Sequence, residues 1–200
     1  MSIHPGRLHD RTIELLGISG SLRRASHNTA VLRTVQQALP GTARMTLFPL
    51  HEIPLYNQEL DGEHLPEPVR ALKEAIAACD GIVIASPEYN YGIPGVLKNA
   101  IDWASRPAGK SPLKNKPVLI MTASPSAVGG ARAQAQIREA LTSTFARVLA
   151  RPQVVIASVG QKVKDGVLAD EATVKFALEA IDDLLREVRL LDSLKEEVKA

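Results

Sequence analysis

The chain has 200 residues, of which 45% are hydrophobic and 23% are charged, a composition typical of one ordinary globular domain. Its formal net charge is only +2, without basic runs, which argues against a nucleic-acid-binding protein and against a strongly acidic carrier protein. Because there is one cysteine, a disulfide framework and a cysteine-based metal cluster are excluded.

The beginning of the chain is polar. Residues 1–11 are predicted to form a flexible N-terminal arm, because they lack the apolar stretch of a signal peptide. No run approaches the ~18 apolar residues of a membrane span, so we expect a cytoplasmic protein without a membrane partner. A single domain is expected over 12–192, followed by a charged C-terminal end at 193–200.

Short apolar segments alternate with helical patterns along the rest of the chain. Strands are predicted at 12–18, 43–48, 81–86, 116–123 and 153–157. Helical stripes of apolar residues are predicted at 31–39, 69–79, 96–105, 137–149 and 174–188, and 158–166 is predicted to be a charged connection. This alternation predicts an α/β protein, a three-layer sandwich with a five-stranded parallel sheet. Five strands fit the flavodoxin-like order 2-1-3-4-5, in which ligands bind at the carboxyl ends of the strands.

The loop after the first predicted strand has the features of a phosphate site. It offers several hydroxyl groups, one amide and the forked cation of Arg23, and it leads into a helix whose N-terminus attracts anions. The alternative is that Ser26 or Asn28 merely caps that helix. The sequence matches neither the dinucleotide fingerprint nor a P-loop, so a monophosphate ester is favoured over a pyrophosphate.

Two further loops are expected beside it at the same edge. Residues 87–95 contain two tyrosines, an asparagine and a carboxylate, which suit a flat ligand, although an ordinary turn-rich loop is the alternative. Residues 124–130 are small and offer backbone donors. A phosphate socket, a flat slot and a rim of backbone amides together suit flavin mononucleotide (FMN).

The motifs in these loops resemble those of a known family. The segments Ser19-Gly20-Ser21-Leu22-Arg23, Ser86-Pro87-Glu88-Tyr89-Asn90 and Ile93-Pro94-Gly95 through Trp103 resemble the NADPH-dependent FMN reductases, a group that includes bacterial quinone, chromate and azo-dye reductases. The resemblance spans about Ile13 to Leu185. It implies a flavodoxin-like fold, bound FMN, and a homodimer or homotetramer.

The resemblance also assigns roles to single residues. The expected FMN-binding residues are Ser19, Ser21, Leu22, Arg23, Ser26, Asn28 and Thr29 for the phosphate and ribityl chain, Pro87, Glu88, Tyr89 and Asn90 along the ring, and Ser124 and Gly129 in the third loop. No catalytic side chain is expected, because the cofactor carries the chemistry. No metal site is expected, because the five histidines and the cysteine lack the spacing of metal ligands. The Tyr91-Gly92 doublet is a variable point of the pattern.

The expected activity is transfer of two electrons from NADPH or NADH, through FMN, to a small acceptor in a ping-pong sequence. Quinones, free flavin, azo compounds and metal oxyanions such as chromate are all compatible acceptors. The alternatives are a flavodoxin-like electron carrier without nicotinamide chemistry and a flavin-free regulatory protein. The candidate residues for binding the 2′-phosphate of NADPH are Arg23, Arg24, Arg106 and Lys110.

Overall fold

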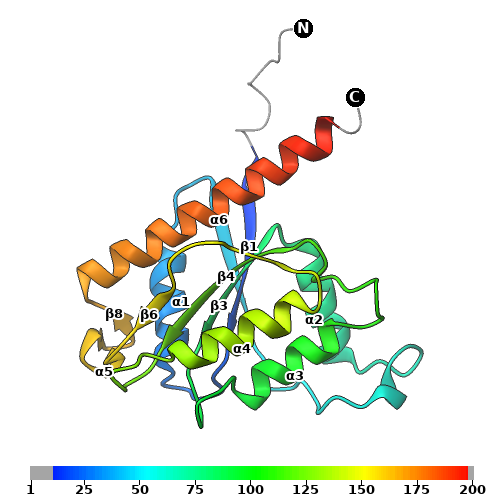
Figure 1. The fold of residues 1–200 in the computed structure, drawn as a ribbon, viewed down its shortest axis with the longest axis horizontal. Coiled ribbons are helices and arrows are strands. Elements are labelled where there is room, and N and C mark those ends of the chain that lie inside the picture. The colour runs from blue at the N-terminus through cyan, green and yellow to red at the C-terminus, as the bar shows by residue number, and fades with distance from the viewer. Residues whose placement is uncertain (1–10, 198–200) are drawn as a thin grey trace, which may run out of the picture.

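A computed structural model of the chain describes residues 11–197, in which strands and helices alternate as predicted (Figure 1). The strands are β1 (Ile13–Ser19), β2 (Ala43–Phe48), β3 (Gly81–Ser86), β4 (Pro117–Ala123), β5 (Arg147–Val148), β6 (Val154–Ile156), β7 (Val163–Lys164) and β8 (Val167–Leu168). The helices are α1 (His27–Gln37), α2 (Glu67–Ala78), α3 (Gly95–Ala104), α4 (Ala131–Thr142), α5 (Val159–Lys162) and α6 (Glu171–Glu197), with a short 3-10 turn η1 (Gln58–Leu60).

The main sheet is parallel and has the order β2-β1-β3-β4-β5, so the predicted α/β, flavodoxin-like topology is confirmed. β3 and β4 are buried along their whole length, as expected of apolar strands covered on both faces. The register pairs Ser19 with Ala85 and Ser86 with Thr122. The strands β1, β3 and β4 therefore end level with one another, and their carboxyl ends form one edge of the sheet, here called the carboxyl edge.

The fifth position of the sheet is divided, which the sequence prediction missed. β5 and β6 both pair with β4, one near its start and one near its end. The predicted helical stripe at 137–149 extends too far, because α4 (Ala131–Thr142) ends at Thr142 and Phe145 has a positive φ of 62°, outside the right-handed helical region. The predicted connection at 158–166 contains α5 and β7, and β7 forms a small antiparallel hairpin with β8, which follows it.

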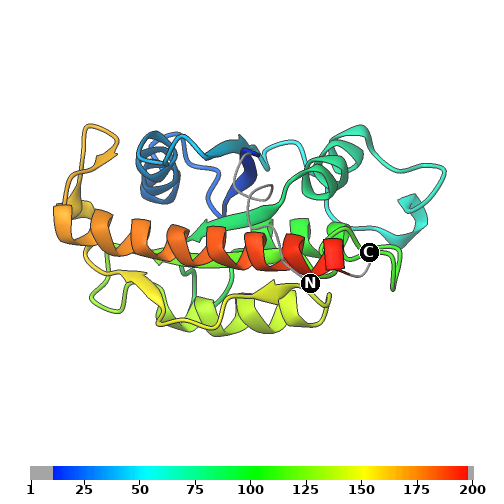
Figure 2. The same ribbon diagram turned by 90° about the horizontal axis from the view of Figure 1, so that it is seen from above.

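Helices cover both faces of the sheet. One hydrophobic cluster joins the sheet to α1 and α6, and a second joins it to α2, α3 and α4. Figure 2 shows α1 and α4 on opposite sides of the sheet. The three layers leave the carboxyl edge of the sheet open to the loops that follow the strands.

The start of β1 and the end of α6 are tied together at the opposite edge (Figure 1). The Arg11 guanidinium pairs with Asp80, which precedes β3, and with Asp192 of α6. Arg11 is the last residue of the predicted arm, and residues 1–10 lie outside the described part. The predicted boundary at 192 falls inside α6, and the domain limits stay a prediction. Over residues 11–197, no helix combines the length and the apolar character that crossing a membrane requires.

Candidate functional site at the carboxyl edge of the sheet

Three loops that are far apart in sequence touch one another at this edge. The Gly20 N–H donates to the carbonyl of Ala85, so the first loop lies against the end of β3. The Asn28 side chain donates to the carbonyl of Ala123 at the end of β4. The Glu88 carboxylate reaches the start of α4, which follows the third loop. The structure thus brings the three predicted loops together.

The first loop closes around the N-terminus of α1. The Ser26 Oγ caps the helix by accepting from the Thr29 N–H at 3.2 Å, and the Thr29 hydroxyl donates to the Ser19 Oγ at 3.0 Å. The Ser21 Oγ accepts from the Arg23 N–H at 3.4 Å. Capping and ligand binding are therefore not alternatives here, because one hydroxyl caps the helix and the others surround its positive end.

The cationic part of this loop lies outermost. Leu22 and Arg23 are exposed, whereas Ser21 and Ser26 are buried. The Arg23 guanidinium forms no ion pair among residues 11–197. This loop thus combines buried hydroxyl groups with an exposed, forked cation, which are groups that could bind a phosphate ester.

Asn28 refines this assignment. Its side chain is buried, with the residue only 3% exposed, and its Nδ2 donates to the Ala123 carbonyl at 3.0 Å. Its Oδ1 is buried and has no hydrogen-bond partner in the described part of the chain. A phosphate dianion has only acceptors, so this oxygen matches a hydroxyl donor better, such as those of a ribityl chain. The residues present fit a sugar-alcohol phosphate.

The second loop contains a tight turn. Tyr89 and Gly92 exchange two backbone hydrogen bonds of 3.2 and 3.0 Å, and the two residues between them, Asn90 and Tyr91, have φ of 50° and 65°. Two positive φ values in the centre of a hairpin define a type I′ turn. Pro87 is buried, whereas Tyr89, Asn90 and Tyr91 are exposed. The turn therefore displays two aromatic rings and an amide at the rim of the site.

Glu88 uses its carboxylate within the protein. Its Oε2 accepts from the N–H groups of Arg132 and Ala133 at 2.9 and 3.2 Å, and its Oε1 accepts from the Arg132 guanidinium at 3.1 Å. The N-cap residue of α4 is Gly130, which has no side chain to do this. The N-terminus of α4 is thus already occupied by an anion, whereas that of α1 remains available.

The third loop is held by the neighbouring strand. The Ser124 N–H donates to the Ile156 carbonyl at 3.2 Å, and the Val159 N–H donates to the Ser124 carbonyl at 3.1 Å. Gly129 is buried with φ of 64°, and a Cβ added there would lie 2.5 Å from the Val155 side chain. Packing and the positive φ therefore require glycine at position 129, whether or not a ligand binds there.

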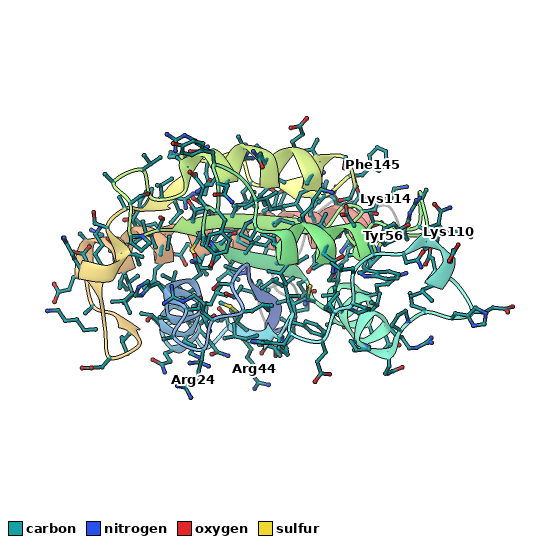
Figure 3. The ribbon with its side chains drawn as sticks, turned by 90° about the horizontal axis from the view of Figure 1, so that it is seen from below. Arg24, Arg44, Tyr56, Lys110, Lys114 and Phe145 are labelled. Carbon is teal, nitrogen blue, oxygen red and sulfur yellow. The ribbon has the colours of Figure 1, made fainter. Side chains whose placement is uncertain are left out.

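The four cations considered for a 2′-phosphate do not lie together. α3 starts at the second loop and has ten residues, so Arg106 follows its far end, about 15 Å away. The Arg106 Nε donates to the Tyr56 hydroxyl, and Figure 3 shows Lys110 far from Arg24. Arg23 and Arg24 belong to the first loop and are the two candidates at the site.

Two residues at the site were missed by the sequence prediction. Arg132 and Gln136 lie one turn apart on α4, and both contact the second loop. Their i, i+4 spacing at a helix start is visible in the sequence, but it does not indicate that their partners lie more than 40 residues earlier. Only the fold shows that contact.

Other chemical groups lie away from this edge. Burial raises the pKa of the Cys79 thiol to about 11, so the thiol stays protonated near neutral pH. Trp103 is fully buried and donates to the Pro54 carbonyl, which is a packing role. Within residues 11–197, histidine, cysteine and carboxylate side chains do not gather in groups of three that would hold a metal ion. A cavity of about 890 Å³ between α4 and α6 contains none of the predicted site residues.

Comparisons with known proteins identify the family of this chain. The family model described as NADPH-dependent FMN reductase matches residues 13–161. An NAD(P)H-dependent FMN reductase of Pseudomonas aeruginosa is 43% identical over 146 residues, which cover 73% of this chain and 78% of that protein. A quinone reductase of Escherichia coli K12 is 40% identical, covering 80% of this chain and 87% of that protein. The structure of FerB, a flavoenzyme NAD(P)H:(acceptor) oxidoreductase from Paracoccus denitrificans, superposes with a TM-score of 0.80 at 31% identity and covers 88% of this chain and 97% of that one. The chain belongs to the NADPH-dependent FMN reductase family.

Proposed function

We propose that this chain is an FMN-containing oxidoreductase that takes two electrons from NADPH or NADH and passes them to a small acceptor. Quinones, free flavin, azo compounds and metal oxyanions such as chromate are the acceptor classes we consider. The proposal is supported by family membership and by relatives named as FMN reductase and quinone reductase. Bound FMN supplies the hydride and electron chemistry, and the protein supplies binding, orientation and electrostatics.

One observation supports the position of FMN above the others. The helices α1, α3 and α4 begin beside the site, and Glu88 occupies the N-terminus of α4. We place the phosphate at the positive end of α1, because the hydroxyl groups of Ser19 and Thr29 lie there and the same loop carries the Arg23 cation. The free oxygen of Asn28 would accept a hydrogen bond from the ribityl chain.

The chain's own residues then have separate tasks. The first loop neutralises the phosphate charge through Arg23 and the α1 N-terminus. The type I′ turn presents Tyr89 and Asn90 along the ring. Backbone N–H groups of the second and third loops would stabilise negative charge on the reduced ring, as oxyanion donors do. A ping-pong order follows if nicotinamide and acceptor share one exposed face.

The alternative is a flavodoxin-like carrier that binds FMN but does not oxidise NAD(P)H. Rapid mixing of the holoprotein with NADPH under anaerobic conditions distinguishes the oxidoreductase from the carrier. We expect loss of the flavin absorbance at a rate that supports turnover, whereas flavin that stays oxidised would favour the carrier. Parallel lines in double-reciprocal plots at several acceptor concentrations would support the ping-pong order, and intersecting lines would contradict it.

Two finer points are part of this proposal. The homodimer or homotetramer rests on the family resemblance alone, and sedimentation of the holoprotein tests it. The cytoplasmic location stays a prediction from the sequence.

A further inference from the structure

The contacts between the second loop and α4 have a consequence for flavin binding. Glu88, Arg132 and Gln136 form a set of side chains, here called the clasp, that connects the turn at residues 89–92 to the first turns of α4. The Glu88 side chain is only 9% exposed, so most of its carboxylate lies inside this contact. α4 in turn packs on the sheet through Ala133, Ile137 and Leu141, which are fully buried.

Gln136 holds the turn through the backbone. Its Oε1 accepts from the Ile93 N–H at 3.0 Å, and its Nε2 donates to the Tyr91 carbonyl at 3.3 Å. One amide side chain therefore fixes both a donor and an acceptor of the loop. A Cβ added at Gly92 would lie 2.7 Å from the Gln136 Oε1, so this contact requires glycine at that position of the turn.

Arg132 holds the turn through a side chain. Its guanidinium carbon lies 4.2 Å from the centroid of the Tyr91 ring, while Glu88 binds the same guanidinium. The Tyr91 residue is 69% exposed, so without this contact little else would restrict its ring. A non-glycine residue with positive φ is costly, and Asn90 and Tyr91 both have one. The clasp supplies contacts that offset this cost.

We propose that Glu88 and Gln136 are positioning residues, which hold the turn in the one conformation that meets the flavin ring. The inference rests on the proposed function, since it concerns the same FMN site. Glu88 then contributes to flavin binding through α4, not by directing its carboxylate at the ring. If loss of the clasp leaves the turn in the conformation that binds flavin only about one tenth of the time, the dissociation constant for FMN rises about tenfold.

The test compares truncated, conservative and control variants of the FMN-free protein and the holoprotein. Glu88→Ala and Gln136→Ala remove the clasp contacts, and Glu88→Gln keeps an oxygen that accepts from the α4 N–H groups. Glu139→Ala is the matched control, because Glu139 is an exposed glutamate on the same helix. The hydrogen-exchange rates of the Gly92 and Ile93 amides measure how often the turn opens in the FMN-free protein. Fluorescence titration measures the affinity for flavin.

In Glu88→Ala and Gln136→Ala we expect faster exchange of those amides and about tenfold weaker binding of both FMN and riboflavin, because both share the ring. Glu88→Gln should recover most of the affinity, and Glu139→Ala should match the wild type. A lower melting temperature with unchanged exchange and unchanged flavin affinity would show that Glu88 only caps α4 and would overturn the inference. If the wild-type protein bound neither flavin, the proposed function would fail, and the exchange rates alone would still decide whether the clasp holds the turn.

Discussion

Replacing Arg23 by alanine tests the phosphate assignment with little disturbance of the fold. The Arg23 side chain is exposed, and it forms no ion pair in the described part of the chain. The hydrogen bond from its backbone N–H to Ser21 remains in the variant. We therefore expect an unchanged melting temperature of the FMN-free protein.

The expected loss of affinity follows from the exposure of this cation. A hydrogen bond to a charged group contributes roughly 1.5–3 kcal/mol. Because water screens an exposed guanidinium, we take the lower end, about 1.5 kcal/mol, which corresponds to about a tenfold higher dissociation constant for FMN. Riboflavin lacks the phosphate, so its dissociation constant should not change.

The assay is titration of the FMN-free protein with FMN and with riboflavin, followed by flavin fluorescence at low and high salt. Arg24→Ala serves as the control, because Arg24 is the neighbouring cation and projects outward from the molecule in Figure 3. The phosphate assignment is refuted if Arg23→Ala leaves the affinity for FMN unchanged. It is also refuted if FMN and riboflavin lose affinity equally.

Three further substitutions test other parts of the account, each by urea unfolding of the FMN-free protein. Gly129→Ala should destabilise by more than about 1 kcal/mol, because the new Cβ meets Val155 at a positive φ, and an unchanged midpoint would contradict this. Ser26→Ala should cost about 1 kcal/mol through the lost cap of α1, and no loss would place the cap elsewhere. Burial raises the pKa of Asp192, but hydrogen bonds from Arg11 and Lys195 outweigh it and hold that pKa below the ordinary value of 3.8. The wild type should therefore lose stability as the pH falls below about 4, and Asp192→Asn should lose less over the same range.

The fold was predictable where one apolar pattern covers a whole element. β3 and β4 are continuous apolar runs, and their burial confirms the parallel sheet. The end of α4 was not predictable in this way, because Phe145 and Val148 continue the helical spacing by coincidence. The chain instead turns at Phe145, and the two residues of β5 are too few to produce a strand pattern.

The site was predictable in its loops and less so in the tasks of single side chains. Gly20 lies in the predicted phosphate loop, yet a Cβ there would lie 2.5 Å from the Ser86 Oγ, so packing alone already requires glycine at this position. Glu88 lies in the predicted loop, but its carboxylate contacts α4. Such tertiary contacts join residues far apart in sequence, and a local motif does not reveal them.

The central claim is that this chain binds FMN and reduces it with NAD(P)H. The most direct measurement is the visible spectrum of the purified protein, recorded before and after anaerobic addition of NADPH. We expect an oxidised flavin spectrum that bleaches within the time of one turnover and returns when a quinone is added. A protein that contains no flavin and takes up no added FMN would contradict the account.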